Sequence, residues 1–284
     1  MKMQIITAKL IQKFREHLME TEKAGATIEK YIRDVTVFAA WLNGDIPDKH
    51  KVLEYKEILI KKYKTTSVNS VLSSLNAFFE YSDWFKLKVK SIKVQRPLFS
   101  DSTKELTKGE YEKLLDAARL KDNERLYLLM QTICVLGIRV SELKYVTVQA
   151  IDKMLAEIYC KGKTRTVLIP KNLCKLLKKY TVKNKIKNGP VFVTKTGQPL
   201  NRSNIWSDMK KLCKIAGVSR DKVFPHNLRH LFARTYYSIE KDIVRLADIL
   251  GHSSINTTRI YTMETGEVHR LQMQRLGLLQ CCTT

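Results

Sequence analysis

The sequence predicts a mainly α-helical protein of two domains that carries one small β-hairpin. Apolar residues recur at helical spacing through the first ninety residues and again through much of the chain after residue 106. Between residues 146 and 170 the pattern changes to short apolar runs around a basic turn, which is typical of a hairpin. A chain of 284 residues is long enough to build two hydrophobic cores.

Residues 1–95 are expected to form the first domain, a bundle of four amphipathic helices. Asn43 and Gly44 end the second helix, as turn residues commonly do. The fourth helix also carries a face of Ser and Asn side chains, which either approaches DNA closely or is an ordinary solvated surface. The apolar stripes of the four helices lie at 10–18, 28–42, 52–63 and 67–81.

A basic segment ends this domain, with Lys86, Lys88 and Lys90 at alternate positions. In an extended conformation the three lysines would point the same way and would suit a phosphate backbone. Residues 96–105 follow, contain Pro97 and several Ser and Thr residues, and are expected to be the interdomain linker.

Residues 106–284 are expected to form the second domain. It opens with a capping box at Thr107 and Glu110, and its second helix ends at Gly137. The hairpin strands are expected at 157–160 and 166–169, and further helices at 172–184, 203–216, 225–238, 243–250 and 267–279.

The net charge of the chain indicates what kind of partner it binds. The chain has 51 Lys and Arg against 28 Asp and Glu, a net charge of +23, which favours nucleic acid as the partner over a merely solvated basic surface. No apolar run approaches the ~20 residues that span a bilayer, and the start lacks a signal-peptide pattern, so we expect a cytoplasmic protein without membrane contact. The six cysteines form no C-x-x-C pair, which argues against a zinc module or a disulfide framework.

The stretch 225–261 gathers the most chemistry. His226 and Arg229 lie three residues apart, so they share one face of a helix. His252 stands just past the end of the next helix, and Tyr261 follows nine residues later. Guanidinium and imidazole donors suit a phosphate, and a phenol beside them could attack the phosphorus.

Two other interpretations of the stretch stay open at this point. The polar residues could be incidental members of a buried helical hairpin. Alternatively, His226 and His230 have the i, i+4 spacing of the zinc motif H-E-x-x-H, although Asn227 stands where that motif needs its general base.

Several short motifs closely resemble those of the tyrosine recombinases, also called lambda-type integrases. The chain reads H-N-L-R-H from His226, L-G-H up to His252 and T-T-R-I-Y up to Tyr261, in the order and with the gaps of that family. The string G-I-R-V-S-E-L around Arg139 resembles the motif of the family's first catalytic arginine. The resemblance implies a SAM-like core-binding domain followed by a catalytic domain, in the two-domain arrangement of Xer recombinases.

The resemblance implies a chemistry that uses no metal and no cofactor. Tyr261 would attack a DNA phosphodiester, giving a 3′-phosphotyrosyl link and a free 5′-hydroxyl. Arg139, Arg229 and His252 would hold the phosphate, and two guanidiniums suit the negative charge of the transition state. His226 would act as the base towards the phenol, which is mostly protonated at pH 7.

The basic hairpin tip is the remaining catalytic element that the resemblance implies. The family places a lysine there that protonates the leaving 5′-oxygen. Lys161 fits the family's G-K-G pattern better, and Lys163 is close enough to take the role. Lys163 and Arg165 are otherwise expected to contact DNA, and Glu142 could pair with Arg139.

The implied partners are double-stranded recombination sites and the protein itself, as a dimer on each site and a tetramer in the synapse. Accessory DNA-binding proteins are a further potential partner. The last helix would either dock on a neighbouring protomer or pack on its own domain. Integration, excision and resolution of multimers or cointegrates all fit. The alternatives are DNA relaxation of the type IB topoisomerase kind and a non-catalytic accessory DNA-binding protein.

Overall fold

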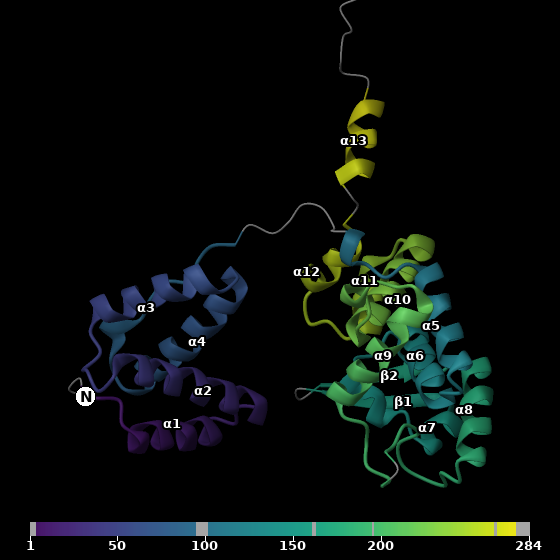
Figure 1. Ribbon diagram of the computed structural model, residues 1–284, viewed down its shortest axis with the longest axis horizontal. Coiled ribbons are helices and arrows are strands. Elements are labelled where there is room, and N and C mark those ends of the chain that lie inside the picture. The colour runs from purple at the N-terminus through teal and green to yellow at the C-terminus, as the bar shows by residue number, and fades with distance from the viewer. Residues whose placement is uncertain (1–3, 95–101, 161–162, 195, 264–265, 277–284) are drawn as a thin grey trace, which may run out of the picture. The chain divides into compact units, whose positions relative to one another are not determined.

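The computed structural model describes residues 4–94, 102–160, 163–194, 196–263 and 266–276. Contacts divide the chain into two compact units, Met1–Arg96 and Pro97–Thr284, here called the N-terminal and the C-terminal unit. Both units are mainly helical, and the described strands form one antiparallel pair, which confirms the expected fold class (Figure 1). Within the described ranges, no helix combines the length and the apolarity that crossing a membrane requires.

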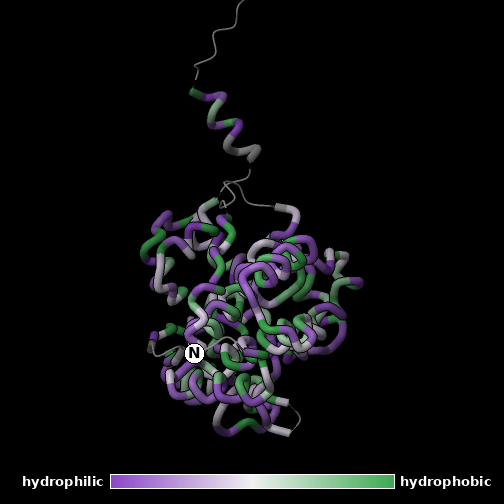
Figure 2. Tube along the Cα trace, turned by 90° about the vertical axis from the view of Figure 1, so that its left-hand side faces the viewer, coloured by the Kyte–Doolittle hydropathy of each residue, from purple (hydrophilic) through white to green (hydrophobic). Residues whose placement is uncertain are grey.

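The described part of the N-terminal unit holds four α-helices whose apolar stripes meet at an aromatic centre. Phe14 packs edge to face on Phe78 with ring centroids 5.3 Å apart, and Phe38 packs likewise on Phe79 at 6.0 Å. Hydrophobic and hydrophilic residues alternate along the helical turns of the tube, as amphipathic helices require (Figure 2). The elements are α1 (Ala8–Glu20), α2 (Gly25–Leu42), α3 (Lys49–Lys62), α4 (Thr65–Tyr81) and the 3₁₀ helix η1 (Phe85–Leu87).

An ionic contact is buried between α2 and α4. The Asp34 carboxylate accepts hydrogen bonds from Lys30 Nζ at 2.8 Å and from Ser74 Oγ at 2.9 Å. Asp34 is 6% exposed, and Ser74 is fully buried. A buried charge is tolerated when it is paired and hydrogen-bonded, so this contact fixes how α2 lies on α4.

The polar face of α4 holds the chain segment that follows η1. The Asn76 side chain donates to the carbonyl of Val89 at 2.8 Å and accepts from its amide at 2.9 Å. Asn69 does the same with Ile92, at 2.9 and 2.8 Å. Each amide side chain thus replaces the partner of an extended strand. Both amide side chains are half-buried and bonded to backbone of the same unit, a role that the polar pattern did not predict.

The three alternating lysines lie around the same segment. Lys86 belongs to the 3₁₀ turn η1, so the extended conformation that would align all three starts only after it. Lys90 is exposed, whereas the half-buried Lys88 pairs with Glu80 at 3.0 Å. The side chain of Lys86 is therefore not aligned with those of Lys88 and Lys90 by an extended backbone.

The C-terminal unit packs its helices around α6, whose Leu128, Met130 and Ile133 are buried. α10 packs on α6, and α5 packs on both α6 and α9. The helical elements are η2 (Ser102–Lys104), α5 (Lys108–Leu120), α6 (Glu124–Leu136), η3 (Val140–Tyr145), α7 (Val148–Lys153), α8 (Lys171–Lys183), α9 (Arg202–Ala216), η4 (Arg220–Lys222), α10 (Pro225–Glu240), α11 (Ile243–Leu250), α12 (Ile255–Thr258), η5 (Arg259–Tyr261) and α13 (Gly266–Arg275).

The hairpin consists of β1 (Leu155–Cys160) and β2 (Lys163–Leu168), paired from Leu155 opposite Leu168 to Cys160 opposite Lys163. Paired residues of an antiparallel hairpin lie on the same face. Ala156 and Ile158 of β1 are buried at 1% exposure each, so this face is turned to the core. The hairpin is therefore anchored along one side.

Replacing Asp34 by Ala is expected to destabilise the contact between α2 and α4 by roughly 2–3 kcal/mol, because Lys30 and Ser74 lose their buried acceptor. As a matched control, Asp45→Ala removes the exposed partner of Lys51 and should cost less than about 1 kcal/mol. Amide hydrogen exchange of the full chain, followed by mass spectrometry on α2 and α4 peptides, measures both effects. Equal loss of protection in the two variants would contradict the assignment.

Candidate active site

The predicted catalytic side chains come from segments far apart in the sequence, and the folding of the C-terminal unit brings the described ones together. Lys161 lies outside the described residues. The others are Arg139 after α6, His226 and Arg229 on α10, His252 after α11 and Tyr261 at the end of η5.

Arg139 is placed by the turn that ends α6. Gly137 caps α6 at φ +60°, where an added Cβ would lie 2.3 Å from Phe232 Cδ1, so glycine is required there. Glu142, in the first turn of η3, accepts from the Arg139 amide at 2.8 Å and from Arg139 Nη1 at 2.9 Å. One carboxylate thereby caps the turn and holds the guanidinium. The Arg139 side chain remains 34% exposed.

Arg229 on α10 is 1% exposed and joins two helix ends. Its Nη1 donates to the carbonyl of Gly137 at 2.8 Å, and its Nη2 donates to the carbonyl of Leu250 at 2.8 Å. Burial and the nearby charge of Arg139 lower the pKa of Arg229 to about 10, so the side chain stays protonated at neutral pH. The guanidinium is thus a fixed positive charge inside the unit.

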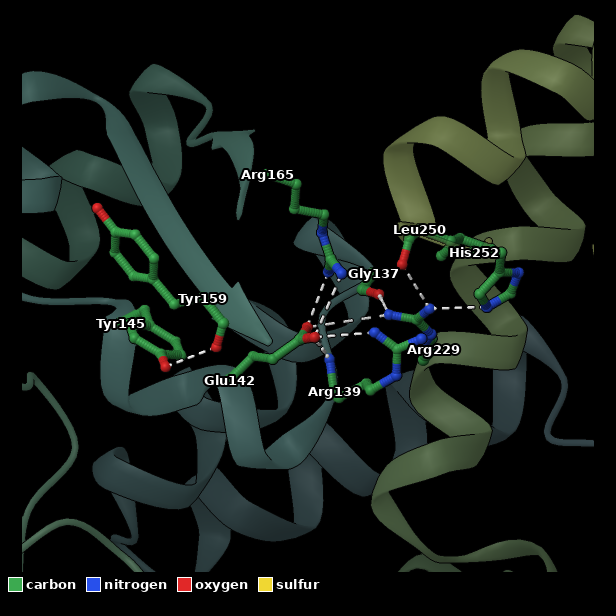
Figure 3. Close-up of polar contacts among 9 residues, drawn as sticks. All are labelled: Gly137, Arg139, Glu142, Tyr145, Tyr159, Arg165, Arg229, Leu250 and His252. Carbon is green, nitrogen blue, oxygen red and sulfur yellow. Dashed lines mark hydrogen bonds and ion pairs between the residues drawn. The ribbon is translucent and has the colours of Figure 1, made fainter. Parts of the chain in front are cut away.

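Glu142 lies at the centre of the arrangement (Figure 3). Arg165 of β2 donates from Nη1 to Oε1 at 3.2 Å and from Nη2 to Oε2 at 2.8 Å, and Arg229 Nη1 lies 4.0 Å from Oε2. Burial raises the pKa of Glu142, but the Arg139 amide and the charges of Arg165 and Arg139 outweigh it, and the pKa is lowered. Three guanidiniums around one carboxylate leave positive charge uncompensated, which suits an anion.

His252 is held in one tautomer by its neighbours. Its Nε2 lies 2.9 Å from Arg229 Nη2, and its Nδ1 lies 2.9 Å from Thr258 Oγ1. Because arginine can only donate, Nε2 accepts and Nδ1 carries the hydrogen towards Thr258. Burial and the charges of Arg229 and Arg139 lower the pKa of His252 to about 4, so the ring is neutral at pH 7.

His230 belongs to the site, although the sequence predicted no catalytic role for it. Its ring lies 4.4 Å from that of His226 and 4.9 Å, edge to face, from that of Tyr261. Burial and the charge of His226 lower the pKa of His230 to about 3, and its Nε2 has no hydrogen-bond partner among the described residues. The second His of H-N-L-R-H, one helical turn after His226, was the signal that could have identified it.

His226 stands at the surface beside these groups. Its side chain is exposed by area, yet the surrounding protein, followed by the charges of Arg229 and Arg139, lowers its pKa. Neutral imidazole is therefore favoured over imidazolium at His226, as a base requires.

Tyr261 is buried at 5% exposure between α10 and α11. It packs with Ala233, Leu246 and Leu250, and its ring is stacked on that of His252 with centroids 6.1 Å apart. The phenol therefore lies beside the positive cluster and is shielded from solvent.

The expected DNA-contacting residues of the hairpin differ in their surroundings. Lys163 begins β2, and its side chain lies outside the described part of the structure. Arg165 is 15% exposed, with both terminal nitrogens bonded to Glu142 instead of pointing to solvent.

The zinc interpretation of His226 and His230 finds no support. The residues described bring together no group of three or more His, Cys, Asp or Glu side chains that could hold a metal ion. The charges nearest to the two rings include Arg229, Arg139 and Arg234, which would repel a cation.

Two family models match the chain. The model described as phage integrase family matches residues 104–267, which are 164 of the 284 residues. The model described as phage integrase, N-terminal SAM-like domain, matches residues 11–84.

A full-length relative agrees with these matches. The tyrosine recombinase XerA of Thermococcus kodakarensis is 30% identical over 282 residues, which cover 95% of this chain and 96% of that protein.

Two solved structures share the fold. A XerH site-specific recombinase bound to palindromic difH substrate, a post-cleavage complex, superposes with a TM-score of 0.68 at 22% identity, covering 88% of this chain and 78% of that one. A lambda integrase tetramer bound to a Holliday junction gives 0.71 at 17% identity, covering 89% and 76%. By the catalytic family model that spans more than half of its length and by its full-length relative, this chain belongs to the phage integrase family, as a Xer-like site-specific tyrosine recombinase.

Proposed function

We propose that this recombinase cuts and rejoins double-stranded DNA through a covalent 3′-phosphotyrosyl bond to Tyr261. The observation that carries the proposal is the positive cluster beside the phenol: the Tyr261 ring is stacked on His252, and His252 Nε2 lies 2.9 Å from Arg229. A scissile phosphate is an anion that this cluster would attract, next to a side chain able to attack it.

Arg139 and Arg229 are proposed to bind the non-bridging oxygens of that phosphate. Negative charge gathers on these oxygens as the Tyr261 oxygen attacks, and donors held in place beforehand stabilise it. The bonds of Arg229 to two backbone carbonyls keep it rigid, while its buried Nε has no partner among the described residues and could donate once a phosphate reaches it. Arg139 is partly exposed and would contact the same phosphate from the surface of the unit.

Removal of the phenol proton is proposed to fall to His226, the exposed neutral imidazole. The His230 ring contacts those of both His226 and Tyr261 and would align them. Because Tyr261 is 5% exposed, a phosphate reaches it only after η5 moves outward, and we propose that DNA binding drives this movement. For His252 to donate to a bound phosphate, its hydrogen would have to move from Nδ1 to Nε2, and Nδ1 would then accept from Thr258.

The leaving 5′-oxygen is proposed to take its proton from a hairpin lysine, Lys161 in preference to Lys163. The bond from phosphorus to O5′ breaks as the bond to the Tyr261 oxygen forms. A 5′-hydroxyl from a second duplex can then reverse the step, which exchanges strands through a Holliday junction.

The assembly is proposed by analogy with the two solved structures, a XerH recombinase bound to difH substrate and a lambda integrase tetramer bound to a Holliday junction. Residues 1–95 would bind the core site, with Lys86 reaching DNA separately from Lys88 and Lys90, 96–105 would be the linker and 106–284 the catalytic domain. One dimer would occupy each site and a tetramer the synapse, with the segment around α13 exchanged between protomers. We place this activity in the cytoplasm, in integration, excision or resolution.

Tyr261→Phe is expected to abolish covalent capture of DNA, because the attacking oxygen is gone. The chain is incubated in EDTA with a nicked suicide substrate that carries its site, and adducts are counted on a denaturing gel. Tyr237→Phe, a partly buried tyrosine of α10, serves as the matched control and should retain capture. An adduct that survives Tyr261→Phe would sink the mechanism, and relaxation of any plasmid without exchange between sites would favour a topoisomerase.

The two hairpin lysines can be told apart with a substrate whose bridging 5′-oxygen is sulfur. A thiolate leaves without a proton, since thiol pKa values lie near 8.5. Lys161→Ala should slow cleavage of ordinary DNA by about 10²–10⁴-fold, and the variant should cleave the sulfur substrate at nearly the wild-type rate. Lys163→Ala should slow both substrates equally, and the reverse pattern would move the acid to Lys163.

The neutral state of His230 predicts how stability depends on pH. Below pH 6.5, the ordinary His pKa, His230 binds a proton in the unfolded chain. In the folded protein it stays neutral until the pH falls to its pKa of about 3. Folding stability is therefore lost as pH falls through this window, by up to roughly 1.4 kcal/mol per pH unit. His230→Gln should make the dependence of stability on pH less steep.

Pulse-labelling hydrogen exchange of α10 peptides across a urea series, at pH 6.5 and 5.0, measures this slope. The same slope in wild type and His230→Gln would mean that His230 takes up its proton in the folded state.

A further inference from the structure

Arg165 occupies a core-facing position of the hairpin. It pairs with Ile158 in the β1–β2 register, and Ile158 is 1% exposed. Since paired residues share a face, the Arg165 side chain is directed inward, beside the catalytic arginines. A residue meant to touch the DNA backbone would be expected on the opposite face.

The guanidinium of Arg165 meets the Glu142 carboxylate end to end. Nη1 and Nη2 bond Oε1 and Oε2 at 3.2 and 2.8 Å, a bidentate geometry that only arginine provides. The same carboxylate holds Arg139 Nη1 at 2.9 Å. Arg165 therefore determines how Glu142 is turned, and Glu142 determines where Arg139 points (Figure 3).

The same side chain passes over the turn that precedes His252. An added Cβ at Gly251 would lie 2.4 Å from Arg165 Nη1 and 2.7 Å from its Cδ. Gly251 also has φ +64°, so glycine is required there both for the left-handed turn and to leave room for the Arg165 side chain. β2, η3 and the end of α11 thus meet at one guanidinium.

We infer that Arg165 is a positioning residue for recombination, acting through Glu142 on Arg139 and through the Gly251 turn on His252. The inference rests on the proposed function, in which Arg139 stabilises the scissile phosphate. Without Arg165, the Glu142 carboxylate loses two of its hydrogen bonds and turns towards Arg229, 4.0 Å away, taking Arg139 with it. Substitution here removes a support of the clamp and leaves the clamp residues themselves in place.

The test compares cleavage of two suicide substrates, one ordinary and one with a neutral methylphosphonate at the scissile position. On the ordinary substrate Arg165→Ala should slow single-turnover cleavage by about 10²-fold, as small misplacements at active sites do. On the methylphosphonate the loss should shrink to a few-fold, because less charge remains for Arg139 to stabilise. Arg165→Lys should fall between, since an ammonium cannot bond both carboxylate oxygens in one plane.

Gly251→Ala tests the contact from its other side. The added methyl displaces Arg165, so this variant should lose rate in the wild-type background and lose little more in Arg165→Ala. Gly217→Ala is the matched control, because Gly217 caps α9 at φ +61° with no atom within 4 Å of an added Cβ. Lys179→Ala on α8, across the unit from α12 (Figure 1), controls for loss of one positive charge.

Three outcomes would overturn the inference. Equal losses of Arg165→Ala on both substrates would indicate a role in folding or DNA affinity. Additive losses in Arg165→Ala with Glu142→Gln would indicate that Arg165 contacts the phosphate itself. Additive losses with Gly251→Ala would remove the link to the His252 turn. Arg139→Ala separates failure of the inference from failure of the proposed function. If its loss of cleavage rate is also as large on the methylphosphonate, the proposed binding of the phosphate by Arg139 is wrong. If the loss shrinks for Arg139→Ala but not for Arg165→Ala, only the inference about Arg165 is wrong.

Discussion

A buried carboxylate stays ionised only when positive partners and hydrogen bonds replace the water it has lost, and Glu142 meets this constraint with groups from separate segments. The turn after α6 provides the amide and guanidinium of Arg139, β2 provides Arg165, and α10 brings Arg229 within 4.0 Å. The segments that satisfy Glu142 are therefore fixed relative to one another. Because three guanidiniums exceed what one carboxylate neutralises, the same constraint leaves a site ready for an anion.

Two glycines allow this convergence. The carbonyl of Gly137 accepts from Arg229 while its missing side chain makes room for Phe232, and Gly251 makes room for Arg165 just before His252. Both have positive φ, so each glycine ends a helix and, because it has no side chain, also lets a neighbouring side chain approach. The helix ends that the sequence marks as terminators are thus also the places where the proposed catalytic groups approach the backbone.

Much of this could be predicted from local pattern. Helical periodicity, the capping box at Thr107 and the terminators at Gly137 and Gly251 locate the elements, and the motif resemblance selects Arg139, Arg229 and Tyr261. The inward direction of Arg165 could not be predicted, because it depends on the hairpin register. Nor could the pairing of Asn69 and Asn76 with a neighbouring segment, since a polar helix face looks the same whether it meets water or backbone. The burial of Tyr261 results from packing between α10 and α11, which short motifs do not encode.

The central claim is that the charge left over around Glu142 binds the scissile phosphate without a metal. The most direct measurement is a crystal structure of the Tyr261→Phe variant bound to its DNA site in EDTA. The account predicts guanidinium nitrogens of Arg139 and Arg229 at roughly 2.7–2.9 Å from the non-bridging oxygens, with Arg165 still bonded to Glu142. A phosphate held by other side chains, with Arg139 turned away from it, would contradict the account.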